Sequence, residues 1–345
     1  MLRKVDIELE FQPTIPGPPY SPKQLMTQAA SNDEITINTW RNTWIEQAKK
    51  NHALKGPFKS SHIGQLYQSL HNQAAIVVGS GPSLKVNILQ LAAASKKLPV
   101  ISCLHNFHYL EDHEVDVKYY VTLDAGPITV TEISEGGTRT PEEYWNLTKD
   151  RTLLAYIGTH PDLIEKWQGK IYWFNCPLPD MEIMKALSEI EQFNCFASTG
   201  GNVLGASMYI CKAILAVNPL IFVGADFGFS YDKKFHGWDS SYDKAGVGQG
   251  IKVTDVFGNR IYTWQSYYNF KLWHDRVASI VPGIYINATE GGCFGAYPEG
   301  NIRQVIQMAL SDVVTMYSHT EPLREMCENP SGEGRSEKRT DLLFS

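Results

Sequence analysis

The sequence predicts an α/β protein built on a Rossmann-like, doubly wound and mostly parallel sheet. Two observations support this fold class. Short β-branched apolar runs alternate with helical stretches from residue 75 onward. Small or polar residues follow most of these runs, at the sheet edge where parallel sheets bind their ligands. The chain has 345 residues, 43% of them hydrophobic, which is enough for a large α/β domain with an additional layer.

Two helices are expected before the sheet, over Ile35–Lys50 and Phe58–Leu70, because Gly56 and Pro57 interrupt the helical pattern between them. The first strand is expected at Ala75–Val78. Further strands are predicted at residues 100–104, 119–123, 151–156, 170–173, 220–223 and 284–286, where short apolar runs occur. Helices are predicted at residues 86–97, 202–217, 264–280 and 301–317, where apolar residues recur at helical spacing or the pattern is amphipathic.

Three regions are predicted from this pattern. Residues 1–70 form a Pro-rich arm with a helical extension, residues 71–317 form the Rossmann-like domain, and residues 318–345 form a flexible tail with little periodicity. Residues 230–258 are polar and Gly-rich between a strand and a helix, so an irregular, lid-like insertion is expected there.

The composition excludes several classes of protein. The net charge is −6 with no basic stripe, which argues against a duplex nucleic-acid partner. The first residues lack the apolar run of a secretory signal, and no run is long enough for a transmembrane span. Six widely spaced cysteines without a CxxC motif suit a reducing compartment, so a cytoplasmic location is expected. Homo-oligomerisation stays open.

The segment AAIVVGSGPSL joins the first strand to a helix through Gly79, Ser80, Gly81, Pro82 and Ser83. Glycines let the backbone approach a phosphate, and a helix N-terminus offers N–H groups and a positive dipole end. Proline fits the first helical turn, where its missing N–H costs nothing. A phosphate-binding turn is therefore predicted, with a tight turn that binds nothing as the alternative.

This turn is not a dinucleotide fingerprint. Leu84 stands where the third glycine belongs, and His105 and Asn106 follow the second strand in place of a ribose-binding acid. The Lys and Ser/Thr of a P-loop are missing as well.

A second glycine pair opens the helix expected at residue 202. Ser198 or Thr199 is placed to cap it, and the N–H groups of Gly201 and Asn202 suit a second phosphate or a carboxylate; a plain N-cap is the alternative. His105, His108 and His113 match no trusted zinc spacing, so no metal site is expected. His236, in FHGWD, suits proton transfer, with a solvated loop histidine as the alternative.

Taken together, four blocks resemble a known superfamily. IVVGSGPSLK, ISCLHNFHYLEDHEVDVKYYVTLDAG, STGGNVLGASMYICKAILAVNPLIFVGADFGFS and INATEGG resemble the Maf-type flagellin glycosyltransferases, whose superfamily includes the archaeal 6-hydroxymethylpterin pyrophosphokinases. The first three blocks also resemble bacterial sialyltransferases that use CMP-sialic acid. The resemblance covers roughly residues 70–310. It departs from the sialyltransferases at Ser80, where they carry Asn, and at Leu104–Asn106, where they carry Cys-Asn-Gln, so the nucleotide base is left unassigned.

The resemblance implies a nucleotide-binding transferase domain and a role for each matching residue. Phosphate contacts are implied for Gly79, Ser80, Gly81, Pro82 and Ser83, and a ribose or base contact for Asn106. The nucleotide edge is implied for Asp124 and Asp226, of which Asp226 is also a candidate catalytic residue. Donor contacts are implied for Thr199, Gly200 and Gly201. A histidine after the strand that ends before Asp226 is the general base in the sialyltransferases, which makes His236 the candidate here.

The function expected from this resemblance is transfer of a nonulosonic, sialic-acid-like sugar from a CMP donor to a hydroxyl of a sugar or protein acceptor. No Asp-x-Asp motif is visible, so no metal cofactor is required. One alternative is diphosphate transfer from ATP to a pterin alcohol, with Mg²⁺ held by carboxylates such as Asp124 and Asp226. Another is a non-catalytic nucleotide-binding or assembly module.

Overall fold

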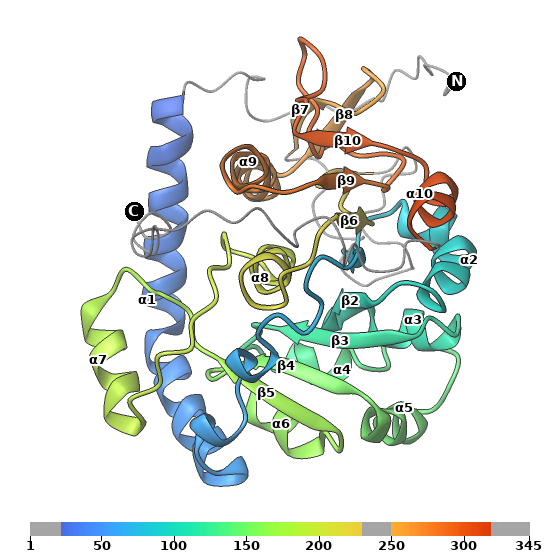
Figure 1. The fold of residues 1–345 in the computed structure, drawn as a ribbon. Helices are drawn as coiled ribbons and strands as arrows, with labels where there is room; N and C mark the ends of the chain where they lie inside the picture. The colour runs from blue at the N-terminus through green and yellow to red at the C-terminus, as the bar shows by residue number, and fades with distance from the viewer. Residues whose placement is uncertain (1–21, 230–249, 319–345) are drawn as a thin grey trace, which may run out of the picture.

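The computed structural model describes residues 22–229 and 250–318, with side chains from residue 35. Its centre is an eight-stranded sheet, and all the strand pairs described in that sheet are parallel (Figure 1). In spatial order the strands are β10 (Val305–Gln307), β9 (Tyr285–Asn287), β6 (Leu220–Val223), β1 (Ala75–Val78), β2 (Val100–Cys103), β3 (Val117–Thr122), β4 (Thr152–Tyr156) and β5 (Lys170–Phe174). The predicted α/β class with a parallel sheet is confirmed.

The order of the strands reverses once. From β1 to β5 each new strand is added to the same edge, and then β6 returns to pair with the free side of β1, with Ile76 opposite Ile221. This reversal places a topological switch point between β1 and β6. Connections leave the two strands in opposite directions there, so a crevice forms at their carboxyl ends.

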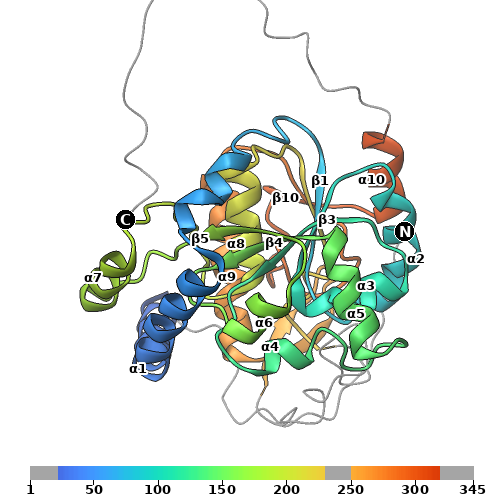
Figure 2. The same cartoon turned by 90° about the horizontal axis from the view of Figure 1, so that it is seen from below.

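Helices cover both faces of the sheet. α8 (Val203–Tyr209) and α9 (Gln265–Ile280) lie on one side, while α2 (Leu84–Ser95) and α10 (Leu310–Tyr317) lie on the other (Figures 1 and 2). The other helices that follow the first strand are α3 (Phe107–Asp112), α4 (Ile128–Thr131), α5 (Pro141–Leu147), α6 (Pro161–Lys166) and α7 (Met181–Ile190). Strands β1, β2 and β6 are buried along their whole length, as is typical of a parallel sheet covered on both faces.

The helical extension is one long helix, α1 (Pro22–Lys55), which is longer than the predicted Ile35–Lys50. It is tied to loops at the carboxyl edge of the sheet: the Gln47 amide donates to the Ala125 carbonyl at 2.9 Å. Asn51 likewise donates to two carbonyls in the loop after β4. α1 therefore supports the loops from which the pocket described below is built.

The second helix predicted in this region, Phe58–Leu70, is wrong. The segment forms two short 3₁₀ turns, Phe58–Ser60 and Ile63–Leu66. It runs alongside β5 instead, since the Trp173 N–H donates to the Ser61 carbonyl. Tertiary contact with the sheet edge competes successfully with helical pairing in this short amphipathic segment.

Two differences occur late in the chain. The described part of the predicted insertion (residues 250–258) is not irregular, because it contains a strand, β7 (Ile251–Thr254), which pairs in antiparallel fashion with β8 (Arg260–Thr263). The predicted helix at residues 301–317 begins late, because its β-branched start, Val305 and Ile306, pairs with β9 instead. The predicted arm (1–21) and tail (319–345), and residues 230–249, lie outside the described residues.

Within residues 22–229 and 250–318, no helix combines the length and the apolar character needed to cross a membrane. The cytoplasmic location stays a prediction.

Candidate functional site

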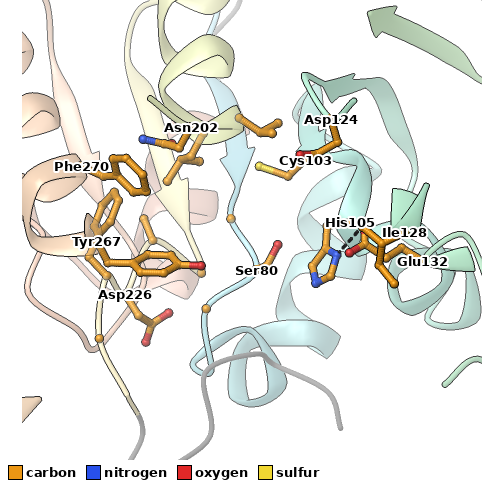
Figure 3. Close-up of a pocket in the computed structure, with 18 residues that line it drawn as sticks. Ser80, Cys103, His105, Asp124, Ile128, Glu132, Asn202, Asp226, Tyr267 and Phe270 are labelled. Atoms are coloured by element: carbon orange, nitrogen blue, oxygen red, sulfur yellow. Dashed lines mark ion pairs between the residues drawn. The ribbon is translucent and has the colours of Figure 1, made fainter. Parts of the chain in front are cut away.

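A cavity of about 310 Å³ opens at the switch point, at the carboxyl ends of β1, β2, β3 and β6 (Figure 3). Its volume is at the lower end of the range for small-molecule sites. The floor comes from the turn after β1 and the turn after β6. One wall comes from β2, β3 and α4, and the other from α8 and α9. Segments distant in sequence therefore meet at the edge where a ligand was predicted.

The Gly-rich turn after β1 crosses the turn after β6 at very short range. A methyl group on Gly79 would lie 2.5 Å from the Gly224 carbonyl oxygen, and one on Gly224 would lie equally close to the Gly79 oxygen. Gly79 N–H donates to Val223, and Gly81 N–H donates to Gly224, each at 2.9 Å. The close crossing of the two backbones is by itself a sufficient reason for glycine at positions 79 and 224, without any ligand. Ser80 lies at the tip between them, with its hydroxyl at the cavity (Figure 3).

Asp226 covers the start of α2. Its carboxylate accepts hydrogen bonds from the Ser83 hydroxyl at 2.7 Å and from the Ser83 N–H at 3.3 Å, and it lies against Gly81. The residue is 5% exposed, and burial raises the pKa of its carboxyl group from 3.8 to about 7, although the bonds from Ser83 oppose this rise. A carboxylate therefore occupies the helix N-terminus that was predicted to hold a phosphate.

The opposite wall carries an ion pair. The Nδ1 atom of His105, just after β2, lies 3.1 Å from the Glu132 carboxylate, just after α4. Although solvent reaches Asp124 at the end of β3, the surrounding protein and the charge of Glu132 raise the pKa of Asp124 to about 6. Burial raises the pKa of the Cys103 thiol to about 12, so this thiol is neutral.

The wall formed by α8 and α9 carries aromatic side chains. Tyr267 and Phe270, both on α9, face the cavity, and the Tyr267 hydroxyl points toward its centre (Figure 3). The next residue of this helix, Lys271, is fully buried; its ammonium contacts the Asp275 carboxylate and donates to the Ala296 carbonyl, both at 2.7 Å. The hydrogen bond from Lys271 to Ala296 joins α9, and with it the aromatic wall, to the loop after β9.

The second glycine pair has a packing role. Gly200 and Gly201 have φ values of +54° and +85°, and methyl groups there would lie 2.3 Å from Trp273 and 2.9 Å from Phe270. The Thr199 hydroxyl accepts from the Gly201 N–H, which makes a local turn. The pair lets the start of α8 approach α9 closely.

Of this predicted donor-binding segment, Asn202 is the residue that lines the cavity. Its side-chain oxygen caps α8 by accepting from the Gly205 N–H at 2.8 Å.

Asn106, predicted to meet a ribose or base, is fully buried beneath the turn. Its amide donates to the carbonyls of Val78 and Gly79 and to the Ser102 hydroxyl. It therefore holds the Gly-rich turn from below. His236, the predicted base, lies outside the described residues.

The described side chains do not fit a preformed Mg²⁺ site. Among residues 22–229 and 250–318, no group of three or more His, Cys, Asp or Glu side chains is placed to hold a metal ion. Asp124 and Asp226 lie on opposite sides of Ser80 in the cavity (Figure 3). The pair of carboxylates that the alternative function needs is therefore not brought together.

Sequence reasoning missed three contributors to the cavity: the His105–Glu132 pair, Tyr267 and Phe270. A signal existed for His105, because it directly follows a predicted strand. The other residues lie on helices whose orientation a single sequence does not define.

The family model described as 6-hydroxymethylpterin diphosphokinase MptE-like matches residues 43–232, which is more than half of the chain. The chain belongs to this MptE-like family. The match includes β1 to β6 and both glycine turns, and it ends before the aromatic wall on α9. No curated protein matches the chain.

Among solved structures, the chain resembles the Maf glycosyltransferase from Magnetospirillum magneticum AMB-1, with a TM-score of 0.55 and 14% sequence identity. The likeness covers 78% of this chain and 38% of that protein, so the chain spans well under half the length of this relative. At this identity the likeness shows a shared fold. The expected MptE-like membership is confirmed by the family match, and the likeness to the Maf glycosyltransferase is one of fold.

Proposed function

We propose that this MptE-like chain is a nucleotide-dependent group transferase that binds its donor in the switch-point cavity. One observation carries the proposal: the cavity lies where doubly wound sheets bind nucleotides, with hydroxyl groups of Ser80 and Tyr267 directed into it. The matching family and the structural relative support it, because the family is named for a diphosphokinase and the relative is a glycosyltransferase.

The donor that best suits the charges is a CMP-linked nonulosonic sugar. The described cavity lining contains three carboxylic acids and one histidine, and no Lys or Arg. A triphosphate would meet these acids without compensation, whereas a CMP donor carries a single phosphate. The raised pKa values of Asp124 and Asp226 further reduce repulsion near neutral pH. The modest cavity volume also favours a nucleoside monophosphate.

In this proposal the phosphate lies beside Ser80 and receives hydrogen bonds from the Ser80 and Tyr267 hydroxyls. Burial raises the pKa of Asp226 to about 7, which weakens the repulsion between its carboxyl group and the departing phosphate near neutral pH. The rings of Tyr267 and Phe270 offer a surface for the cytosine or the sugar. The acceptor is a hydroxyl of a sugar or a protein.

Diphosphate transfer from ATP to a pterin alcohol is the second candidate, and the family match over residues 43–232 favours it. The same cavity would hold the nucleotide. The two candidates differ in the phosphate number of the donor and in the need for Mg²⁺.

Thermal unfolding with CMP, CDP, UDP, GDP and ATP, each with and without Mg²⁺, separates these candidates. A ligand that binds only the folded state at 100 times its Kd adds about 2.7 kcal/mol to the free energy of unfolding. We expect CMP to raise the Tm without Mg²⁺, and release of CMP from a CMP-linked sugar to require an acceptor. A shift with ATP that requires Mg²⁺ would favour diphosphate transfer, and no shift with any nucleotide would favour a non-catalytic module.

Two matched variants test the proposed position of the donor phosphate. Ser80→Ala removes a hydroxyl that faces the cavity, so we expect a smaller nucleotide-induced shift. Ser188→Ala removes an exposed hydroxyl on α7, outside the cavity, and should leave the shift unchanged. Equal shifts in the two variants would contradict the proposed phosphate position.

A further inference from the structure

We propose that Asp124, at the carboxyl end of β3, is the general base that removes the proton from the acceptor hydroxyl. This inference rests on the proposed transferase function and names the residue that would start its chemical step. The sequence resemblance implies the nucleotide edge for Asp124 and makes His236 the candidate base, so the assignment differs from both expectations.

The carboxylate of Asp124 is available to a ligand. The residue lines the cavity and is exposed to solvent. Within the part of the chain that the structure describes, this carboxylate accepts no hydrogen bond and forms no ion pair. A general base must come within hydrogen-bond reach of the hydroxyl that it deprotonates, and an exposed carboxylate with free lone pairs meets that condition.

The backbone around Asp124 is held in place from three sides. Its N–H donates to the Thr122 hydroxyl of β3 at 3.3 Å, and its carbonyl accepts from the His160 N–H, in the loop after β4, at 3.0 Å. The carbonyl of the next residue, Ala125, accepts from the Gln47 amide of α1 at 2.9 Å. These bonds use backbone groups of the loop and leave the carboxylate free, so an acceptor would meet a base on a fixed support.

Other ionisable side chains of the described lining are engaged or enclosed. Both oxygens of Asp226 accept hydrogen bonds from Ser83, and Glu132 lies 3.1 Å from the Nδ1 atom of His105. The Nε2 atom of His105 is enclosed by the protein, so an acceptor in the cavity does not reach it. Burial raises the pKa of the Cys103 thiol to about 12, which keeps it neutral.

The surroundings of Asp124 suit proton transfer near neutral pH. The surrounding protein and the charge of Glu132, just after α4, raise its pKa to about 6, while His105, just after β2, opposes this rise. Cys103, at the end of β2, is neutral and adds no charge. At pH 7 the carboxyl group is therefore mostly ionised, yet it is a stronger base than an ordinary aspartate.

The position of Asp124 also separates the acceptor from the donor. In Figure 3 Asp124 lies on one side of Ser80, while Tyr267 and Asp226 lie on the other. A donor phosphate beside Ser80, with the aromatic wall behind it, leaves the Asp124 side of the cavity open to an acceptor. The separation also keeps the anionic base away from the anionic phosphate.

The transfer step forms one bond and breaks another. The acceptor O–H gives its proton to a carboxylate oxygen of Asp124 while the acceptor oxygen forms a bond to the anomeric carbon of the donor sugar. The bond from that carbon to the phosphate oxygen breaks, and its electron pair leaves with CMP. Because Asp124 is exposed to solvent, it then returns the proton to water.

Asp124→Asn tests the assignment, because it keeps the shape of the side chain and removes the base. We expect kcat for transfer to fall about 10²-fold or more, in the range typical of a lost general base, while the CMP-induced Tm shift is retained. Asp312→Asn is the matched control. Asp312 is exposed on α10, outside the cavity, so this variant should keep the wild-type kcat.

The dependence of kcat/KM on pH gives a second readout. In the wild type kcat/KM should fall as the pH drops below about 6, because a protonated Asp124 accepts no proton. This acidic limb should be absent in Asp124→Asn. Asp124→Glu keeps a carboxylate, so we expect it to keep the limb and to exceed the kcat of Asp124→Asn by about 10-fold or more.

Three results would overturn the assignment. The first is a kcat within about threefold of wild type in Asp124→Asn. The second is an acidic limb that persists in Asp124→Asn and disappears in His236→Ala, which would give the role to His236. The third is loss of the CMP-induced shift in Asp124→Asn, which would make Asp124 a binding or folding residue. Failure of the proposed function looks different, because the wild-type protein would then show no nucleotide-induced shift.

Discussion

The buried carboxylate of Asp226 predicts an unusual dependence of stability on pH. Asp226→Asn keeps the shape of the side chain and an oxygen that can accept from the Ser83 N–H, but it removes the ionisation. The wild-type carboxyl group is 5% exposed, and burial raises its pKa from 3.8 to about 7. That rise corresponds to about 4 kcal/mol of preference for the protonated form in the folded state.

The sign follows from which state holds the proton. Between about pH 4 and pH 7 the folded protein binds this proton and the unfolded chain does not. The free energy of unfolding of the wild type therefore falls as the pH rises through this window, by up to about 1.4 kcal/mol per pH unit, and levels off above it. Asp226→Asn has no carboxyl group to titrate, so its free energy of unfolding does not fall in this way. Between about pH 5 and pH 8 the stability difference between the variant and the wild type should therefore change by about 3 kcal/mol in favour of the variant.

Urea unfolding of both proteins across this pH range measures the difference. Ser83→Ala is the companion variant: it removes the hydroxyl that lowers the pKa of Asp226, so its stability loss should extend to higher pH. Parallel curves for the wild type and Asp226→Asn would refute the reasoning, because they would show that Asp226 is ionised in the folded protein at every pH tested.

Three further predictions concern the walls of the cavity. Gly81→Ala would place a methyl group 2.0 Å from the Asp226 carboxylate and should lower the free energy of unfolding by about 2–3 kcal/mol in chemical denaturation. Gly126→Ala is the control: its methyl group would lie no closer than 3.6 Å to a neighbour, so the free energy of unfolding should change by less than about 0.5 kcal/mol. Lys271→Ala leaves a buried carboxylate without its cation, so a loss of about 3–5 kcal/mol is expected by calorimetry; a loss under about 1 kcal/mol would contradict the pairing. Gln47→Ala removes the bond from α1 to the loop after β3 and should cost about 1 kcal/mol and raise hydrogen exchange in that loop; unchanged exchange would show that α1 is not its support.

Sequence reasoning predicts the sheet well because its signals are local. Apolar four-residue runs such as Ala75–Val78 and Leu220–Val223 appear in the structure with those same bounds. The helix predicted over Phe58–Leu70 fails because contact with β5 decides its conformation. The start of the helix predicted at residue 301 fails because Val305 completes a sheet edge. In each failure the deciding partner is far away in the sequence.

In the candidate site, too, local features are predictable and contacts between distant segments are not. The turn at Gly79–Ser83 is predictable from its position between a strand and a helix. The carboxylate that covers it is Asp226, more than 140 positions later, and this contact depends on which strand pairs with β1. The pairing of His105 with Glu132 depends on how a one-turn helix closes over β2. A single sequence carries no signal for either contact.

The crossing of the turns at Gly79 and Gly224 also bears on the order in which the chain can become functional during synthesis. Strands β1 to β5 emerge first and can pair in chain order, but β1 then presents an unpaired edge to its surroundings. Only the arrival of β6 covers that edge, and the same event closes the floor of the cavity. A ribosome-bound fragment that ends before residue 220 would thus expose an unpaired strand edge and lack half of the cavity floor. The cavity can therefore form only after the second half of the sheet has been added.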